Sequence, residues 1–462
     1  MSLAALRERL PRGVRAPLRY ALSLAEQGCA SILNLGLNLW LIREVGAAEY
    51  GVFVLWTNIS LMLGSVQNAL SLCHLLALPP GEEHAPARRE PERLLLGVSL
   101  IMIALTAIGG VATALLADGR DGELVPWEVA SFLPAVLIYA YARALAFSRG
   151  AVSMAFVLTA SVLGTGLVLF ALSYAAGIRP DAGWTLLILT GAYGMAGGAG
   201  LIRLSAGIRP MLRPAELRPY LQYLAQSRWV LLGVGATELL MRFYSFIVIA
   251  WFGTAALGVL SAAQVMLRPA VLAVTSWGWV ARSEMAASRE REEWGGFLRS
   301  LGRGLVGTLL ISLPWAICVW LAWPVISARL YGGRYADAGW IALLWGGSAA
   351  LGGVLGALSI GLQSLRAFRP LALADLAGSL VSVAATLLLL SRFSYPMSIV
   401  GMMIGQALEV VLLASTLGRL VPYAKTSGKG SALDPPLEPV AAQRTPDAIT
   451  RLERRQRAKS TT

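Results

Sequence analysis

The sequence predicts an all-α polytopic membrane protein with twelve transmembrane helices in two six-helix lobes related by pseudo-two-fold symmetry. Three observations support this fold class. The 462 residues are 56% hydrophobic and only 14% charged, whereas soluble domains carry about 25% charged residues. The apolar residues fall in blocks long enough to cross a bilayer of about 30 Å. A short motif also recurs at a constant offset in the two halves of the chain.

Twelve apolar segments are predicted to cross the membrane as α-helices. A transmembrane β-barrel would show alternating segments of about ten residues, and the sequence has none. The first 19 residues carry five arginines, as a signal peptide would. The apolar run after them is too long and lacks a small-residue cleavage site, so we expect it to be retained. The predicted spans are 20–42, 51–78, 94–117, 129–147, 151–176, 184–204, 229–252, 256–280, 305–326, 338–362, 371–390 and 397–418.

The basic residues predict the orientation of these spans. If the N-terminus lies inside, the inside segments hold 31 of the 39 lysines and arginines, and the outside loops hold 6. The other two, Arg242 and Arg268, lie within spans. Because cytoplasmic loops are enriched in basic residues, both termini are expected in the cytoplasm. The net charge of +13 then reflects topology and anionic headgroups, so we expect membrane lipids, and not nucleic acid, as partners.

The loops and the cysteines exclude several kinds of site. The longest outside loop, 118–128, has about a dozen residues, so we expect no folded extracytoplasmic domain. Cys29, Cys73 and Cys318 all lie inside apolar blocks, which argues against a disulfide framework and against a metal cluster. We therefore expect a protein that is not an enzyme and has neither a cofactor nor a metal ion.

The predicted domains are an N-terminal lobe (1–204), a cytoplasmic interfacial linker (205–228), a C-terminal lobe (229–420) and a cytoplasmic tail (421–462). The linker combines arginine, proline and tyrosine. The tail is rich in Lys, Ser, Pro, Asp and Arg and cannot bury enough apolar surface to fold alone. We expect the tail to be disordered, with docking on a partner or on the membrane as the alternative.

A repeated motif supports the division into two lobes. Residues 41–53 join spans one and two, and residues 248–260 join spans seven and eight. Two glycines five residues apart suit a helix stop and a tight restart, because positive φ is cheap for glycine. A repeated six-helix unit is a transporter plan in which two bundles rock about a central site. At an offset of 207 the matched positions are Gly46 with Gly253, Ala48 with Ala255 and Gly51 with Gly258.

Polar residues follow one helical face in the first two spans of each half, at spacings of three, four or seven. Buried polar groups in hydrocarbon are costly unless they meet water, a ligand or one another. We therefore expect these faces to wall a wet cavity, with helix-to-helix adhesion as the alternative. The faces are Ser23, Gln27, Ser31, Asn34 and Asn38; Thr57, Ser60, Gly64, Gln67, Ser71 and His74; Glu238, Arg242 and Ser245; and Ser261, Gln264, Arg268 and Thr275.

The charged residues within spans are the sharpest candidates. An arginine at a helix centre costs about 3 kcal/mol on insertion scales. Glu238 and Arg242 can pair within one helix, whereas Arg268 has no acidic neighbour one turn away and either meets Glu238 across the bundle or attracts an anion in a cavity. The candidate substrate-binding residues are Gln27, Asn34, Asn38, Gln67, Arg242, Gln264 and Arg268. The candidate coupling carboxylates are Glu26, Glu238 and Asp375, with structural roles as the alternative.

Three stretches carry a resemblance to a known family. They are Asn34-Leu35-Gly36-Leu37-Asn38 through Gly46-Ala47-Ala48-Glu49-Tyr50-Gly51-Val52-Phe53, then Leu330-Tyr331-Gly332-Gly333-Arg334-Tyr335-Ala336-Asp337-Ala338-Gly339, and Gly361-Leu362-Gln363 with Arg366 and Arg369. Over about residues 15–420 the chain resembles bacterial polysaccharide-unit (O-antigen or exopolysaccharide) flippases of the multidrug/oligosaccharidyl-lipid/polysaccharide exporter superfamily.

The resemblance implies a V-shaped pair of lobes in the bacterial cytoplasmic (inner) membrane. It implies alternating access, with a lipid-diphosphate-linked oligosaccharide moved from the inner to the outer leaflet for cell-surface polysaccharide biosynthesis. A polysaccharide polymerase and a chain-length regulator are further implied partners. In such flippases cavity arginines are thought to hold the diphosphate and acidic sugars, a role that Arg242 and Arg268 suit by type and depth. Glu238 beside Arg242 departs from this pattern and would neutralise it.

Two other functions compete with this one. An H⁺- or Na⁺-coupled multidrug or organic-cation antiporter of the same superfamily would use cavity carboxylates, namely Glu26, Glu238 or Asp375. A membrane glycosyltransferase or polymerase would need a large outside loop or a carboxylate–metal site, and the sequence contains neither pattern.

Overall fold

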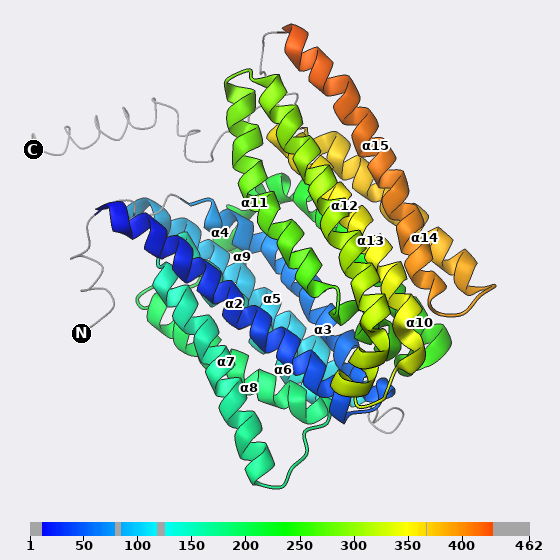
Figure 1. The fold of residues 1–462 in the computed structure, drawn as a ribbon. Coiled ribbons are helices and arrows are strands. Elements are labelled where there is room, and N and C mark those ends of the chain that lie inside the picture. Colours follow the sequence, from blue (N-terminus) through cyan, green and yellow to red (C-terminus); the bar gives the residue numbers. More distant parts are fainter. Residues whose placement is uncertain (1–11, 79–84, 118–124, 366, 428–462) are drawn as a thin grey trace, which may run out of the picture.

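A computed structural model describes residues 12–78, 85–117, 125–365 and 367–427 (Figure 1). Helices make up almost all of these residues, and none of them forms a strand. The first half contains α2 (Arg12–Glu44), α3 (Ala47–Gln67) continued by η1 (Asn68–Leu72) and α4 (Cys73–Leu76), α5 (Ala85–Ala117), α6 (Pro126–Ser148), α7 (Val152–Ala175) and α8 (Ala182–Leu204). The second contains α9 (Pro214–Leu217), α10 (Tyr220–Val265), α11 (Arg268–Glu290), α12 (Trp294–Val325) continued by η4 (Ile326–Leu330), η5 (Ala336–Ala338), α13 (Gly339–Ser364), α14 (Phe368–Leu390) and α15 (Met397–Ser427).

Helix α10 supplies two membrane segments because it bends sharply at Gly253, where φ is 82°. The part after the bend continues as α11 beyond a break at Met266 and Leu267. The matching glycine of the first half, Gly46, caps α3 with φ of −70°. Only one of these two repeat glycines therefore needs the positive φ that the motif predicted.

The two halves pack their helices in the same pairs. In the first half α2 packs on α7, α5 on α6, α6 on α8, and α7 on α8. The corresponding pairs of the second half are α10 with α14, α12 with α13, α13 with α15, and α14 with α15. Figure 1 shows them as two bundles, blue to teal and green to orange. The predicted twelve-helix fold with two lobes and pseudo-two-fold symmetry is therefore confirmed.

Ten helices of the described chain are long and apolar enough to cross a membrane by length and composition. The segments α2 and α11 fall outside this group. Helix α2 carries the polar face that the sequence predicted for span one, and α11 carries Arg268 and Thr275 of the face predicted for span eight. Among the described helices that the sequence predicted as spans, the two that are less apolar than a typical membrane span are thus two that we expected to border a wet cavity.

The segment between the lobes lies on the first lobe. The Met211 N–H donates to the carbonyl of Arg93 at 3.1 Å, and the Arg93 side chain donates to the carbonyl of Arg209 at 2.9 Å. The Tyr220 hydroxyl, at the start of α10, donates to the carbonyl of Leu70 at 2.8 Å. The domain boundaries drawn from the sequence stay predictions. Most of the predicted tail, 428–462, lies outside the described residues.

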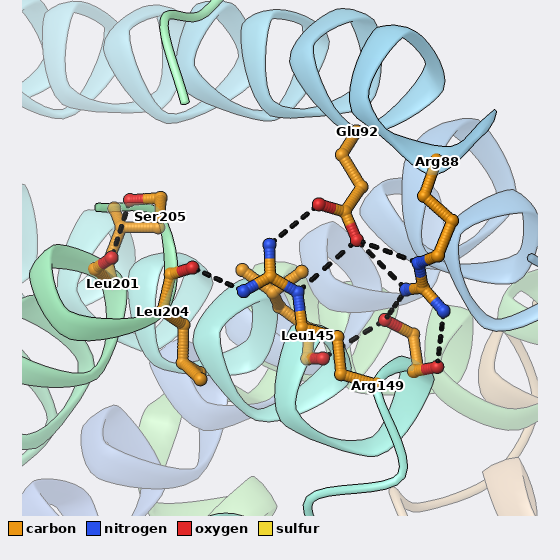
Figure 2. A network of polar contacts seen from close by, with 8 residues as sticks. Arg88, Glu92, Leu145, Arg149, Leu201, Leu204 and Ser205 are labelled. Carbon is orange, nitrogen blue, oxygen red and sulfur yellow. Dashed lines mark hydrogen bonds and ion pairs between the residues drawn. The ribbon is translucent and has the colours of Figure 1, made fainter. Parts of the chain in front are cut away.

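A buried ionic network joins α5, α6 and α8 at the end of the first lobe. Figure 2 shows the Glu92 carboxylate between two guanidinium groups, with Arg88 at 2.9 Å and Arg149 at 2.6 Å. Arg88 also donates to the carbonyl of Ser148, and Arg149 to the carbonyl of Leu204. Buried charges are tolerated when they are paired and hydrogen-bonded. This network therefore holds one end of the lobe together.

Candidate functional site

A cavity of about 950 Å³ lies between the two lobes. Helices α2 and α3 of the first lobe line one wall, and α10, α11, α13 and α15 of the second lobe line the others. Its size is that of a small-molecule binding site. Its polar and charged lining residues are Ser31, Asn34, Asn58, Arg242, Gln264, Arg268, Thr275, Arg282, Ser348, Ser359, Gln363 and Gln406.

The charge of the cavity wall is one-sided. Three arginines, Arg242, Arg268 and Arg282, line the cavity, and no aspartate or glutamate of the described chain does so. Aromatic and amide side chains complete the wall, with Trp277 and Trp345 among them. A wall of this composition attracts an anion and offers donors to hydroxyl groups.

Arg268 lies at the first turn of α11, directly after the break at Met266 and Leu267. The sequence had placed it in the middle of one uninterrupted span. The N-terminus of a helix carries a partial positive charge and favours anions. Pro269 follows within the first turn, where its missing N–H costs nothing. The guanidinium and the positive end of α11 therefore lie at the same place in the cavity wall.

Arg268 is bonded to the opposite lobe. Its guanidinium donates to the side-chain oxygen of Asn34 on α2. The Asn38 amide donates to the same Asn34 oxygen at 2.9 Å, and the Tyr50 hydroxyl donates to the Asn38 oxygen at 2.7 Å. Arg268 also interacts electrostatically with Tyr50 and Tyr331. In the described part of the chain, Arg268 forms no ion pair.

Arg242 has a different environment. It forms an ion pair with Glu238 one turn earlier on α10, as the sequence predicted. Glu238 also accepts a hydrogen bond from Ser65 on α3 at 2.7 Å, and Asn58 donates to Ser245 across the same contact at 3.5 Å. Arg242 thus lines the cavity with its charge balanced by Glu238, whereas Arg268 forms no ion pair with the residues that the structure describes.

The end of the cavity near the α2–α3 turn is closed. The Arg334 guanidinium donates to the carbonyl of Val45 in that turn. The Tyr331 hydroxyl donates to the carbonyl of Ala262 at 2.8 Å, and the Trp323 indole donates to the carbonyl of Tyr335 at 2.9 Å. We call this group the distal seal: Val45, Tyr50, Tyr331, Arg334 and Tyr335. The second stretch of the sequence resemblance, residues 330–339, builds most of it.

Comparison with solved structures identifies the fold. The chain is similar to the lipid II flippase MurJ in an inward closed conformation, with a TM-score of 0.66 and 14% identity over 86% of this chain and 87% of that chain. It is also similar to an inward-facing multidrug resistance MATE family transporter of the MOP superfamily, with a TM-score of 0.62 and 13% identity over 88% of this chain and 100% of that chain. The chain shares the fold of these two structures. No family model matches it, and no curated protein matches it.

A further comparison concerns conformation. An outward-facing structure of a MATE family transporter with the MOP fold covers 89% of this chain with a TM-score of 0.54 and 13% identity. The two structures titled as inward give higher scores.

Four of the seven predicted substrate-binding residues line the cavity. The other three lie elsewhere. Gln67 is fully buried and donates to the carbonyl of Leu137 on α6 at 3.1 Å. Asn38 is 5% exposed and supports Asn34, and Gln27 is exposed on α2 away from the cavity wall. The four cavity residues are Asn34, Arg242, Gln264 and Arg268.

The polar face predicted for span two points into the first lobe. Ser71 donates to the carbonyl of Leu95 on α5 at 3.1 Å and accepts from Ser99 at 2.9 Å. These contacts, and the contact of Gln67 with α6, join helices of one lobe. This is the helix-to-helix adhesion stated as the alternative. Asn58, on another side of the same helix, lines the cavity instead.

The sequence interpretation also missed cavity residues outside spans one, two, seven and eight. Gln363 on α13 and Gln406 on α15 both line the cavity, and Ser348 donates to Gln406 at 3.2 Å. Arg282, two heptads after Arg268 on α11, lies at the far end of the same wall. The signal available was the amide side chains inside spans ten and twelve, which the interpretation did not weigh.

None of the candidate coupling carboxylates lines the cavity. Glu26 forms an ion pair with Arg143 at 2.6 Å and accepts from Thr159 at 2.7 Å. Asp375 on α14 lies near Glu409 on α15, and the Glu409 side chain lies against Gly378. One Glu409 oxygen, Oε2, is buried without a hydrogen-bond partner in the described part of the chain.

Proposed function

We propose that the protein is a flippase that moves a lipid-diphosphate-linked oligosaccharide from the inner to the outer leaflet of the bacterial cytoplasmic (inner) membrane, for cell-surface polysaccharide biosynthesis. The observation that carries the proposal is the cavity between the lobes, whose described wall contains arginines and no carboxylate. The fold is shared with a structure titled lipid II flippase. A diphosphate-linked sugar fits both the charge and the amide lining of the cavity.

The diphosphate is proposed to bind at Arg268. A guanidinium binds phosphate oxygens with two parallel N–H bonds, and the N-terminus of α11 adds its partial charge at the same place. Discontinuous membrane helices present their N-termini to anionic groups in other transporters. Gln264 and Gln406 line the same cavity and are proposed to bind sugar hydroxyls.

Alternating access is proposed as the mechanism. The distal seal closes the end of the cavity at the α2–α3 turn, and the two structures titled as inward give higher TM-scores than the outward-facing one. The basic residues of the sequence favour cytoplasmic termini. We therefore propose that the cavity loads from the cytoplasmic side, and that a polysaccharide polymerase and a chain-length regulator act on the flipped product.

One observation favours the second candidate function, an H⁺-coupled antiporter for organic cations. Asp375 and Glu409 lie close together between α14 and α15, and a pair of carboxyl groups is a site that an exchanger can use to carry a proton. The fold is also that of structures titled multidrug resistance MATE family transporter. Against this candidate, Glu26 and Glu238 are neutralised by Arg143 and Arg242 and line no part of the cavity.

The test is a flipping assay in reconstituted vesicles with an isoprenyl-diphosphate-linked disaccharide, in which an added enzyme modifies only the sugar on the outer surface. We expect Arg268→Ala to reduce the flipping rate at least about tenfold, because a charge-assisted contact of about 1.5–3 kcal/mol is lost. Asn58→Ala, which removes an uncharged lining residue, is the matched control. Retained flipping by Arg268→Ala contradicts the proposal. Uptake of a fluorescent cation driven by a pH gradient supports the antiporter instead.

A further inference from the structure

The contact between Arg268 and Asn34 crosses the cavity from one lobe to the other. It gives the guanidinium a neutral acceptor, the oxygen of a side-chain amide. The contact lies next to the distal seal, since Asn34 is hydrogen-bonded to Asn38, and Asn38 accepts at 2.7 Å from the hydroxyl of Tyr50, a residue of that seal. The amide oxygen of Asn34 therefore binds the Arg268 guanidinium more weakly than an anion would.

Hydrogen bonds from Asn38, which is itself bonded to Tyr50, hold Asn34 in place. The Asn38 amide donates to the Asn34 backbone carbonyl at 2.7 Å and to its side-chain oxygen at 2.9 Å. Asn38 is 5% exposed, and the fully buried Tyr50 hydroxyl donates to its oxygen at 2.7 Å. These bonds orient the Asn34 oxygen toward the cavity. Asn38, which the sequence predicted as a substrate-binding residue, thus positions Asn34 instead.

A phosphate oxygen competes well against this amide. Hydrogen bonds between a guanidinium and an ionised acceptor are about twice as strong as those to a neutral one. The Asn34 oxygen and an incoming phosphate oxygen would both reach the Arg268 guanidinium from the cavity, because Asn34 and Arg268 both line it. An arriving anion therefore meets a guanidinium whose existing partner can be displaced at modest cost, about that of a single hydrogen bond.

We propose that Asn34 is a latch on Arg268 in the unloaded protein, and that the cargo anion displaces it. This inference rests on the proposed function, in which the cavity takes an anion. Displacement removes one polar contact between the lobes beside the distal seal. The hydrogen bond from Arg334 to the carbonyl of Val45 is one of the polar contacts that remain there. Loading from one side then weakens the closure on the other side, which couples binding to movement of the lobes.

The binding arm of the test titrates farnesyl diphosphate into the full chain in lipid nanodiscs and follows the heat. We expect Asn34→Ala to bind the probe about fivefold more tightly, because a competing acceptor has been removed. We expect Asn34→Asp to bind it at least about tenfold more weakly, because a fixed carboxylate neutralises Arg268. Asn68→Ala, which removes an exposed amide outside the cavity wall, is the matched control and leaves the affinity unchanged.

Asn38→Ala provides a second variant in case Asn34→Ala does not fold. It leaves the Asn34 side chain present but without its orienting donor, so the affinity again rises. If Asn34→Ala or Asn38→Ala weakens binding or leaves it unchanged while Arg268→Ala abolishes it, Asn34 is a ligand or a bystander and the latch is wrong. If Arg268→Ala binds the probe normally, the anion site itself is wrong, and the proposed function falls with it.

The conformational arm measures the distance between the lobes at the sealed end. Spin labels at Arg179→Cys and Arg392→Cys, both in exposed turns at that end, report it in a background without Cys29, Cys73 and Cys318. Farnesyl diphosphate is expected to lengthen the mean distance or to add a longer population, and Asn34→Ala to do so partly without probe. A distance that responds to the probe equally in Asn34→Asp and in the unaltered chain overturns the latch.

Discussion

Gly51 in α3 and Gly258 in α10 contact each other across the seam between the lobes. A Cβ on either glycine would lie 3.2 Å from the amide nitrogen of the other. A Cβ on Gly51 would also overlap the carbonyl of Thr254, and a Cβ on Gly258 would overlap the carbonyl of Ala47. Each pair is separated by the same 207 residues as the sequence repeat. The contact is therefore reciprocal, as at a two-fold axis.

The first prediction concerns this seam. We expect Gly51→Ala and Gly258→Ala each to destabilise the protein by about 1–3 kcal/mol, because the new methyl group meets backbone atoms that cannot turn away. Thermal unfolding in nanodiscs measures the loss. Gly46→Ala is the control, since a Cβ there meets nothing within 4 Å and its φ of −70° suits alanine. Equal losses in all three variants would contradict the close approach of α3 and α10.

The second prediction concerns the balanced charge at Arg242. Glu238→Gln keeps an acceptor for Ser65 but removes the carboxylate that neutralises Arg242. We expect farnesyl diphosphate to bind about threefold more tightly or better, because a second full cation then faces the cavity. The double variant Glu238→Gln with Arg242→Gln should change the affinity little, since it removes both charges of the pair and keeps the local net charge. Calorimetric titration measures the affinity of each variant for farnesyl diphosphate. Weaker binding by Glu238→Gln would show that Glu238 and Arg242 act as one unit in binding.

The third prediction concerns the ionic network of Figure 2. Glu92→Ala leaves Arg88, which is 4% exposed, without the carboxylate that it shares with Arg149. Removing one partner of a buried ion pair costs about 3–5 kcal/mol, so we expect a clear drop in the unfolding temperature. The nearby exposed Glu90 is the matched position, and Glu90→Ala should unfold like the unaltered chain.

The fourth prediction concerns the pair Asp375 and Glu409. Asp375→Asn gives Glu409 an amide neighbour but removes the carboxyl group of Asp375, and with it any proton that the pair carries. If that proton is exchanged during transport, an imposed pH gradient should speed transport in the unaltered chain and have no effect in Asp375→Asn. The assay is transport in vesicles with and without the gradient. An unaltered response of Asp375→Asn would assign the pair a structural role only.

The spans, the repeat and the ion pair of Glu238 with Arg242 followed from local patterns. Apolar length sets which segments cross a membrane, and pairing at i, i+4 is a property of one helix. The face of a helix that carries polar residues also follows from its period. Which neighbour that face meets is a different matter, because a serine or glutamine can satisfy its hydrogen bonds against another helix or against water. Gln67 and Asn58 illustrate this, since they lie on the same helix and only Asn58 reaches the cavity.

What the sequence determined by itself was the helical membrane fold, its two-fold repeat and the presence of an arginine, Arg268, with no acidic residue one turn away. These depend on composition, spacing and charge along one chain. Only the tertiary structure decided that α11 begins at Arg268, that Asn34 from the other lobe is its partner, and that Gln363 and Gln406 complete the cavity. The physical reason is that a cavity between lobes is formed by residues far apart in sequence, whose approach depends on how whole helices pack.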